Sequence, residues 1–150
     1  METVATTTAL LVAVLNGAAA VVGGVLWWRV DPRPWVWPLI RSGQAAAVVL
    51  AVVAGVAYLT GARPDEGLFW LYAVLPSAIS FFAEQFRVLA AQTVLEARGL
   101  EDAQAVGRLP EREQRSVVLQ IVRRELGIMA LAAGVIAILA LRAISETPGL

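Results

Sequence analysis

The sequence contains no cysteine and no histidine, and each absence excludes a class of chemistry. Without cysteine, the chain has no disulfide, no thiolate metal ligand and no cysteine nucleophile. Without histidine, it lacks the commonest metal ligand, a usual axial ligand of haem and the usual general base. We therefore expect no metal site and no cofactor.

Lysine is absent as well, and charged residues make up only 16% of the chain. The 12 basic residues are all arginine and are balanced by 12 acidic residues, so the formal net charge is zero. No strongly basic segment stands alone, so we expect no nucleic-acid partner. The sequence also has no G-x-S-x-G elbow and no phosphate-binding glycine loop. We therefore predict that the protein is not an enzyme.

Apolar residues dominate instead, at 59% of the chain, and gather in four long stretches. These stretches span residues 4–28, 39–59, 68–91 and 126–144. As helices, each is long enough to cross a hydrocarbon core ~30 Å thick, in which backbone groups must bond to one another. No basic residue precedes Arg29, so we expect the first stretch to remain as a span rather than to be cleaved as a signal. The predicted fold is all-α, an integral membrane four-helix bundle.

The arginines predict an orientation for this bundle. Ten of them fall on one side of the four spans, and two, Arg63 and Arg142, fall on the other. The ten are Arg29, Arg33, Arg41, Arg87, Arg98, Arg108, Arg112, Arg115, Arg123 and Arg124. Because positive residues favour the cytoplasmic side, both termini and the 60–67 turn are expected outside, and the 29–41 and 92–125 connections inside. The expected location is the bacterial cytoplasmic membrane, as a multi-pass protein.

Aromatic residues predict the same two boundaries. Amphipathic rings collect at the headgroup level on both sides of a membrane. The inner set is Trp27, Trp28, Trp35 and Trp37, and the outer set is Tyr58, Phe69, Trp70 and Tyr72.

The last two long helices are predicted to extend beyond the membrane as a cytoplasmic hairpin. A single transmembrane domain over residues 1–150 contains helices at about 4–28, 39–60, 68–98 and 110–144, with the hairpin at about 92–125. Gly99 offers a C-terminal stop, and Pro110 suits the first turn of the last helix. The hairpin faces expected to meet carry Val88, Ala91 and Leu95 on one helix and Val118, Ile121 and Val122 on the other. Glu111 and Arg115 are spaced for an i,i+4 ion pair.

Small residues and one asparagine mark the expected helix contacts within the membrane. The first apolar stretch carries two small-residue stripes, Ala20 with Gly24, and Gly17 with Ala20 and Gly23. The second stretch carries Ala47, Ala51 and Gly55. Such stripes let helices approach closely. Asn16, a polar residue near the midplane, is expected to form an interhelical hydrogen bond, with a substrate or ion ligand as the alternative.

One constellation of polar residues lies at the expected inner boundary. It comprises Arg41, Gln44, Glu84, Arg87, Arg123, Arg124 and Glu125. Ionisable groups within spans are costly and usually face protein or water, which makes Glu84 the principal candidate. Three roles remain open: a structural clamp between helices, binding of lipid headgroups by the arginines, and a proton- or ion-coupled step at Glu84.

The sequence leaves several functions open. The first is a noncatalytic structural or accessory subunit of a larger membrane complex, and the alternative is a small homo-oligomeric transporter or channel with Glu84 in the pathway. A membrane-embedded enzyme acting on lipid would need a second catalytic carboxylate or a metal. The expected partners are membrane lipids, including anionic headgroups, and other membrane subunits or further copies of the chain.

Overall fold

The described part of the chain is mostly helical. The computed structural model describes residues 1–64 and 67–147, and these residues form five helices and no strand. The helices are α1 (Glu2–Arg29), α2 (Val36–Leu59), α3 (Leu68–Ala97), α4 (Ala103–Gly107) and α5 (Glu111–Ser145). The prediction of an all-α chain is confirmed. Residues 65 and 66 of the predicted external turn lie outside the described residues.

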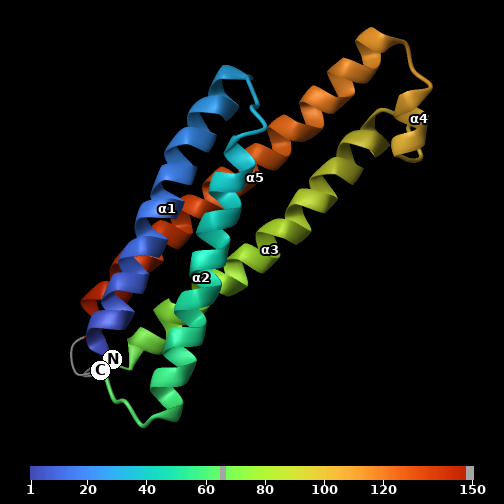
Figure 1. Cartoon of the computed structure of the whole chain (residues 1–150). Helices are drawn as coiled ribbons and strands as arrows, with labels where there is room; N and C mark the ends of the chain where they lie inside the picture. The colour runs from blue at the N-terminus through green and yellow to red at the C-terminus, as the bar shows by residue number, and fades with distance from the viewer. Residues whose placement is uncertain (65–66, 148–150) are drawn as a thin grey trace.

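The four long helices pack side by side, with each one lying along two others. α5 lies along α1 and α3, and α2 lies along the same two helices on the other side. The start of α1, the α2–α3 connection and the end of α5 lie at one end of the molecule (Figure 1). The α1–α2 connection and α4 lie at the other end, where α3 and α5 lean away from α2 as a helical hairpin (Figure 1).

Three of the described helices, α1, α2 and α5, are long and apolar enough to cross a membrane. α3 is not among them, because Pro76, Ser77, Glu84 and Gln85 lower the mean hydropathy of its sequence. Composition therefore supports three of the four predicted spans.

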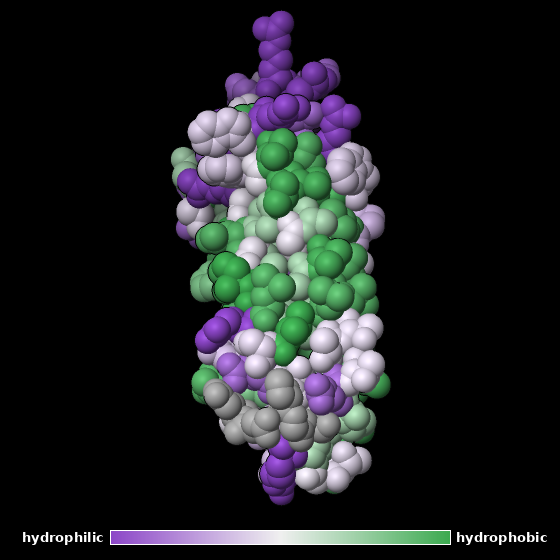
Figure 2. Space-filling model, turned by 90° about the vertical axis from the view of Figure 1, so that its left-hand side faces the viewer, coloured by the Kyte–Doolittle hydropathy of each residue, from purple (hydrophilic) through white to green (hydrophobic). Residues whose placement is uncertain are grey.

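The surface of the helices is apolar where a water-soluble protein would be polar. Large side chains such as Val21, Leu131 and Ile138 are 68%, 72% and 64% exposed. Figure 2 shows apolar side chains gathered in a broad band on one face, with hydrophilic side chains beyond the band at both ends. A contiguous apolar surface of this kind indicates contact with lipid or with another protein.

The core between the helices is built largely from alanine, so the backbones approach closely. Ala9, Ala47 and Ala140 are fully buried, and a Cβ built on Gly23 would lie 3.1 Å from the Ala130 Cβ. The predicted stripes were partly wrong. Gly17, Gly24 and Gly55 have no neighbouring atom within 4 Å of such a Cβ, so they do not mediate close contacts within the described chain.

Two further predictions about side-chain orientation need correction. Phe69 is fully buried in the core rather than exposed in an aromatic belt, and its ring meets Trp70 edge-on at 5.2 Å. In the hairpin, Val94 and Val117 are each 1% exposed, whereas Val88 and Val118 are about half exposed. The helix faces that meet are therefore rotated from the predicted ones.

The hairpin turn follows its sequence signals. Gly99 adopts a positive φ of 67°, and the amides of Gly99 and Leu100 donate to the carbonyls of Glu96 and Leu95. This is a Schellman motif, which ends α3 where the glycine predicted a stop. Asp102 then caps α4 by accepting a hydrogen bond from the Ala105 amide at 2.8 Å.

Candidate functional site

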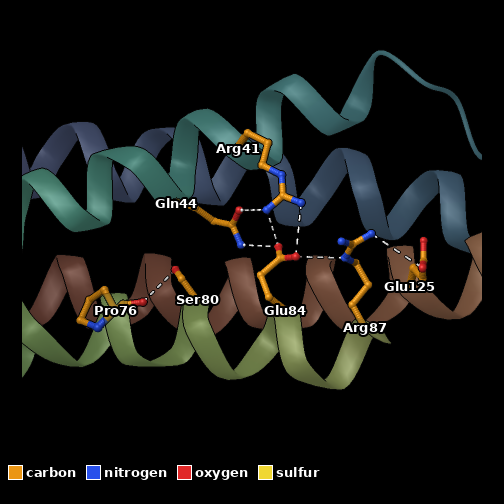
Figure 3. Close-up of polar contacts among 7 residues, drawn as sticks. All are labelled: Arg41, Gln44, Pro76, Ser80, Glu84, Arg87 and Glu125. Atoms are coloured by element: carbon orange, nitrogen blue, oxygen red, sulfur yellow. Dashed lines mark hydrogen bonds and ion pairs between the residues drawn. The ribbon is translucent and has the colours of Figure 1, made fainter. Parts of the chain in front are cut away.

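Glu84 on α3 is the centre of a polar cluster that joins three helices (Figure 3). Its Oε1 accepts hydrogen bonds from Arg41 Nη1 at 2.5 Å and from Gln44 Nε2 at 3.0 Å. Its Oε2 accepts from Arg87 Nε at 3.0 Å and from Arg41 Nη2 at 3.3 Å. Both carboxylate oxygens are therefore engaged by groups of the same chain.

The cluster extends to α5 through Arg87. Arg87 Nη1 lies 3.7 Å from Glu125 Oε1, and its guanidinium lies 5.8 Å from the centre of the Trp37 ring. Two arginines thus face two glutamates, and the formal charges of the cluster cancel. We use the name "polar cluster" below for Arg41, Gln44, Glu84, Arg87 and Glu125.

Helical spacing brings these side chains together. Arg41 and Gln44 are three residues apart on α2, and Glu84 and Arg87 are three apart on α3, so each pair occupies one helix face. Arg41 Nη1 also donates to Gln44 Oε1 at 2.8 Å, which orients both groups toward Glu84. The Glu84 side chain is 25% exposed and that of Arg41 50%, so the cluster lies at the flank of the helices.

Arg123 and Arg124, which the sequence placed with this cluster, lie elsewhere. Arg123 stacks over the Trp27 ring at 5.4 Å, and its Nε approaches the Trp27 carbonyl oxygen at 3.4 Å. Arg124 lines a groove beside Trp27. Both arginines were expected to face the cluster, and their directions around α5 differ from that expectation.

Asn16 forms a separate contact between α1 and α2. Its side chain is buried, and Nδ2 donates to the carbonyl oxygens of Val12 at 2.9 Å and Gly43 at 3.0 Å. A Cβ on Gly43 would lie 2.8 Å from Asn16 Oδ1, so glycine is required for this approach. The interhelical bond was expected from the sequence, but the role of Gly43 was not, although Gly43 lies four residues before Ala47 and continues the Ala47, Ala51 and Gly55 stripe.

The interior beside Asn16 is nearly closed. A cavity lined by Asn16, Gln44 and Ser80 has a volume of about 10 Å³, which is room for about one water molecule. Ser77 Oγ donates across helices to the Ala47 carbonyl oxygen at 3.0 Å, and Ser80 Oγ donates to the Pro76 carbonyl oxygen at 2.9 Å (Figure 3 shows the second bond). Polar groups of α3 therefore find partners inside the protein.

The chemistry available to this site is that of a satisfied ionic network. Within residues 1–64 and 67–147, no group of His, Cys, Asp or Glu side chains is placed to hold a metal ion. In the same residues, no buried side-chain nitrogen or oxygen lacks a hydrogen-bond partner. No protein-family model matches the chain, and no curated protein and no solved structure is similar to it.

Proposed function

We propose that this chain is a noncatalytic integral membrane protein that serves as a structural or accessory subunit of a larger membrane complex. In this proposal it is a four-helix transmembrane bundle of the bacterial cytoplasmic membrane, with both termini outside and the α3–α5 hairpin in the cytoplasm. The gathering of ten arginines toward the end that carries α4 supports that orientation.

α3 serves as the fourth span, although its composition is less apolar than that of the other long helices. Ser77 and Glu84 make their hydrogen bonds within the protein, Ser77 to the Ala47 carbonyl oxygen and Glu84 with Gln44 of α2. Polar groups that have hydrogen-bond partners inside the protein cost less free energy to place in lipid than their hydropathy suggests. Its outer face carries Leu71, Val74 and Phe81, each at least half exposed.

The observation that carries a structural role is the full engagement of Glu84 by Arg41, Gln44 and Arg87. A carboxylate that takes part in transport must exchange its partners or its proton during each cycle. Here four hydrogen bonds from two helices hold it. We assign the polar cluster the role of a clamp that fixes α2, α3 and α5 relative to one another.

The alternative, a small homo-oligomeric transporter or channel with Glu84 in its pathway, receives less support. The cavity between Asn16, Gln44 and Ser80 holds about 10 Å³, far less than a solute pathway requires. A pathway would then have to run between copies of the chain, and Glu84 would have to leave its two arginine partners to reach it.

A groove beside the hairpin is the proposed docking surface for the partner subunit. A groove of about 360 Å³ lies between the α1–α2 connection and α5, lined by Pro32, Pro34, Trp37, Val118 and Val122. Arg33 and Arg115 border it. Apolar side chains with flanking arginines are typical of protein interfaces.

Co-purification with hairpin variants tests this function. We expect the tagged wild-type chain, purified in a mild detergent from its native membrane, to retain one unrelated membrane protein at fixed stoichiometry. Val118→Asp, which places a charge at the groove, should lose that protein, whereas Arg108→Asp at the hairpin tip should retain it. Retention of no other protein by the wild type would contradict the proposal.

A further inference from the structure

Two apolar grooves run along opposite sides of α5 and meet on its outer surface. The first has a volume of about 640 Å³, lies between α1 and α5, and is lined by Gly24, Trp27 and Arg124. The second has a volume of about 620 Å³, lies between α3 and α5, and is lined by Phe86 and Val135. Both are lined by Ala90, Ile128 and Leu131, so the two grooves adjoin at these residues, and we call the pair the forked depression.

The length of this depression matches one leaflet of a bilayer. From Arg124 to Val135 the α5 axis advances ~16 Å at 1.5 Å per residue. Half of a hydrocarbon core ~30 Å thick is ~15 Å. In the proposed transmembrane orientation, the depression therefore begins at the depth of the polar cluster and ends near the middle of the membrane.

The end of the depression that faces the hairpin is positively charged. Among the described residues, no carboxylate lies within ion-pair distance of Arg123 or Arg124, whereas Arg41 and Arg87 are both paired. Arg123 is held over the Trp27 ring, and the Trp27 indole lies against Gly127, where a Cβ would be 2.8 Å from Nε1. The Arg124 guanidinium, which makes no ion pair within the described residues, thus lies beside Trp27 at one end of the forked depression.

We propose that this depression binds a phospholipid with an anionic headgroup. The Arg124 guanidinium binds the headgroup phosphate, with the positive charge of Arg123 nearby, and the two acyl chains occupy the two grooves. The charge favours an anionic lipid over a zwitterionic one, since guanidinium and phosphate form strong charge-assisted hydrogen bonds. This inference is independent of the proposed subunit role, because the depression lies away from the groove that contains Val118.

Native mass spectrometry of the full chain in detergent, with equal amounts of phosphatidylglycerol and phosphatidylcholine added, tests the headgroup. We expect the wild type to retain phosphatidylglycerol in preference. Arg124→Gln should weaken phosphatidylglycerol binding roughly tenfold, the loss of about one charge-assisted hydrogen bond. Arg108→Gln, which removes an arginine at the hairpin tip, should leave binding unchanged. Equal retention of the two lipids, or equal effects of the two variants, would overturn the proposal.

A second variant tests the grooves. Ile128→Trp places a bulky ring where the two grooves meet and leaves Arg124 in place, so we expect it to reduce retained lipid while circular dichroism stays helical. Unchanged phosphatidylglycerol binding would show that the arginines hold an anion without the grooves, and would overturn the acyl-chain assignment.

A photocrosslinker at Leu131 should label lipid in membranes. Labelling of a second polypeptide instead would assign the depression to a partner helix and overturn the proposal.

Discussion

Arg41 on α2 and Glu84 on α3 face each other across a helix interface, with two nitrogen–oxygen contacts of 2.5 and 3.3 Å. Arg87 approaches the same carboxylate from its own helix and continues to Glu125 on α5. The contact is strong because Arg41 presents two nitrogens to two oxygens, a geometry that a single amine cannot match. Because the contact lies at the flank of the helices, solvent and lipid headgroups screen it and reduce its contribution to the free energy of unfolding.

Replacing Glu84 should destabilise the protein without changing solute flux. Glu84→Gln leaves Arg41 and Arg87 close together with no carboxylate between them, and we expect the free energy of unfolding to fall by about 1–3 kcal/mol. Denaturant unfolding in detergent micelles, followed by circular dichroism, measures the loss.

The matched control is Glu113→Gln, which removes a carboxylate from an exposed position on the hairpin that makes no ion pair within the described chain. It should leave the free energy of unfolding unchanged. If Glu84→Gln left the free energy of unfolding unchanged and abolished proton or ion flux in liposomes, Glu84 would belong to a transport pathway and not to a structural clamp.

Gly43 should tolerate no side chain. Gly43→Ala places a Cβ 2.8 Å from Asn16 Oδ1, which forces the asparagine away from the carbonyl to which it now donates. We expect a loss of about 1–3 kcal/mol in the free energy of unfolding, from the broken interhelical bond and the separation of α1 from α2.

Gly55→Ala provides the comparison, because no atom lies within 4 Å of the added Cβ. It lies on the same helix and gains helix propensity, so its stability should equal or slightly exceed that of the wild type. Equal losses for the two variants would show that the loss at Gly43 does not come from its contact with Asn16.

The topology can be measured cleanly because the chain has no native cysteine. Arg63→Cys in the α2–α3 connection should react with a membrane-impermeant maleimide in intact cells. Arg108→Cys after α4 should react only after the membrane is opened or inverted. This pair of results requires α3 to cross the membrane, since residues 63 and 108 lie on either side of it in the chain. Labelling of both cysteines from outside the cell would show that α3 does not cross the membrane.

The sequence predicted the type and approximate extent of the helices but not their rotation about their own axes. In a helix with apolar residues on all sides, the periodicity does not mark one face as the core. The prediction therefore chose Val88 and Val118 for the hairpin contact, where the structure buries Val94 and Val117. It placed Phe69 in an aromatic belt for the same reason.

The candidate site was predictable in part, from charge and depth together. Spacing along α2 and α3 brought Arg41, Glu84 and Arg87 to one level, and the structure joins them. Arg123 and Arg124 share that level but point toward α1 and toward the forked depression, and adjacent residues on a helix diverge by about 100°. The positions of Arg123 and Arg124 beside Trp27 could not be predicted from residue spacing, because Trp27 lies on α1 and the arginines on α5, and these helices meet only in the folded chain.

The mass of the intact assembly tests the central claim most directly. The chain has a mass of 16.0 kDa, so complexes made only of this chain have masses at integer multiples of that value. We would extract the protein from its native membrane into lipid nanodiscs and measure the released complex by native mass spectrometry. We expect an assembly that contains this chain and a fixed number of copies of a different membrane protein. Assemblies at integer multiples of 16.0 kDa alone would contradict the subunit role and favour a homo-oligomer.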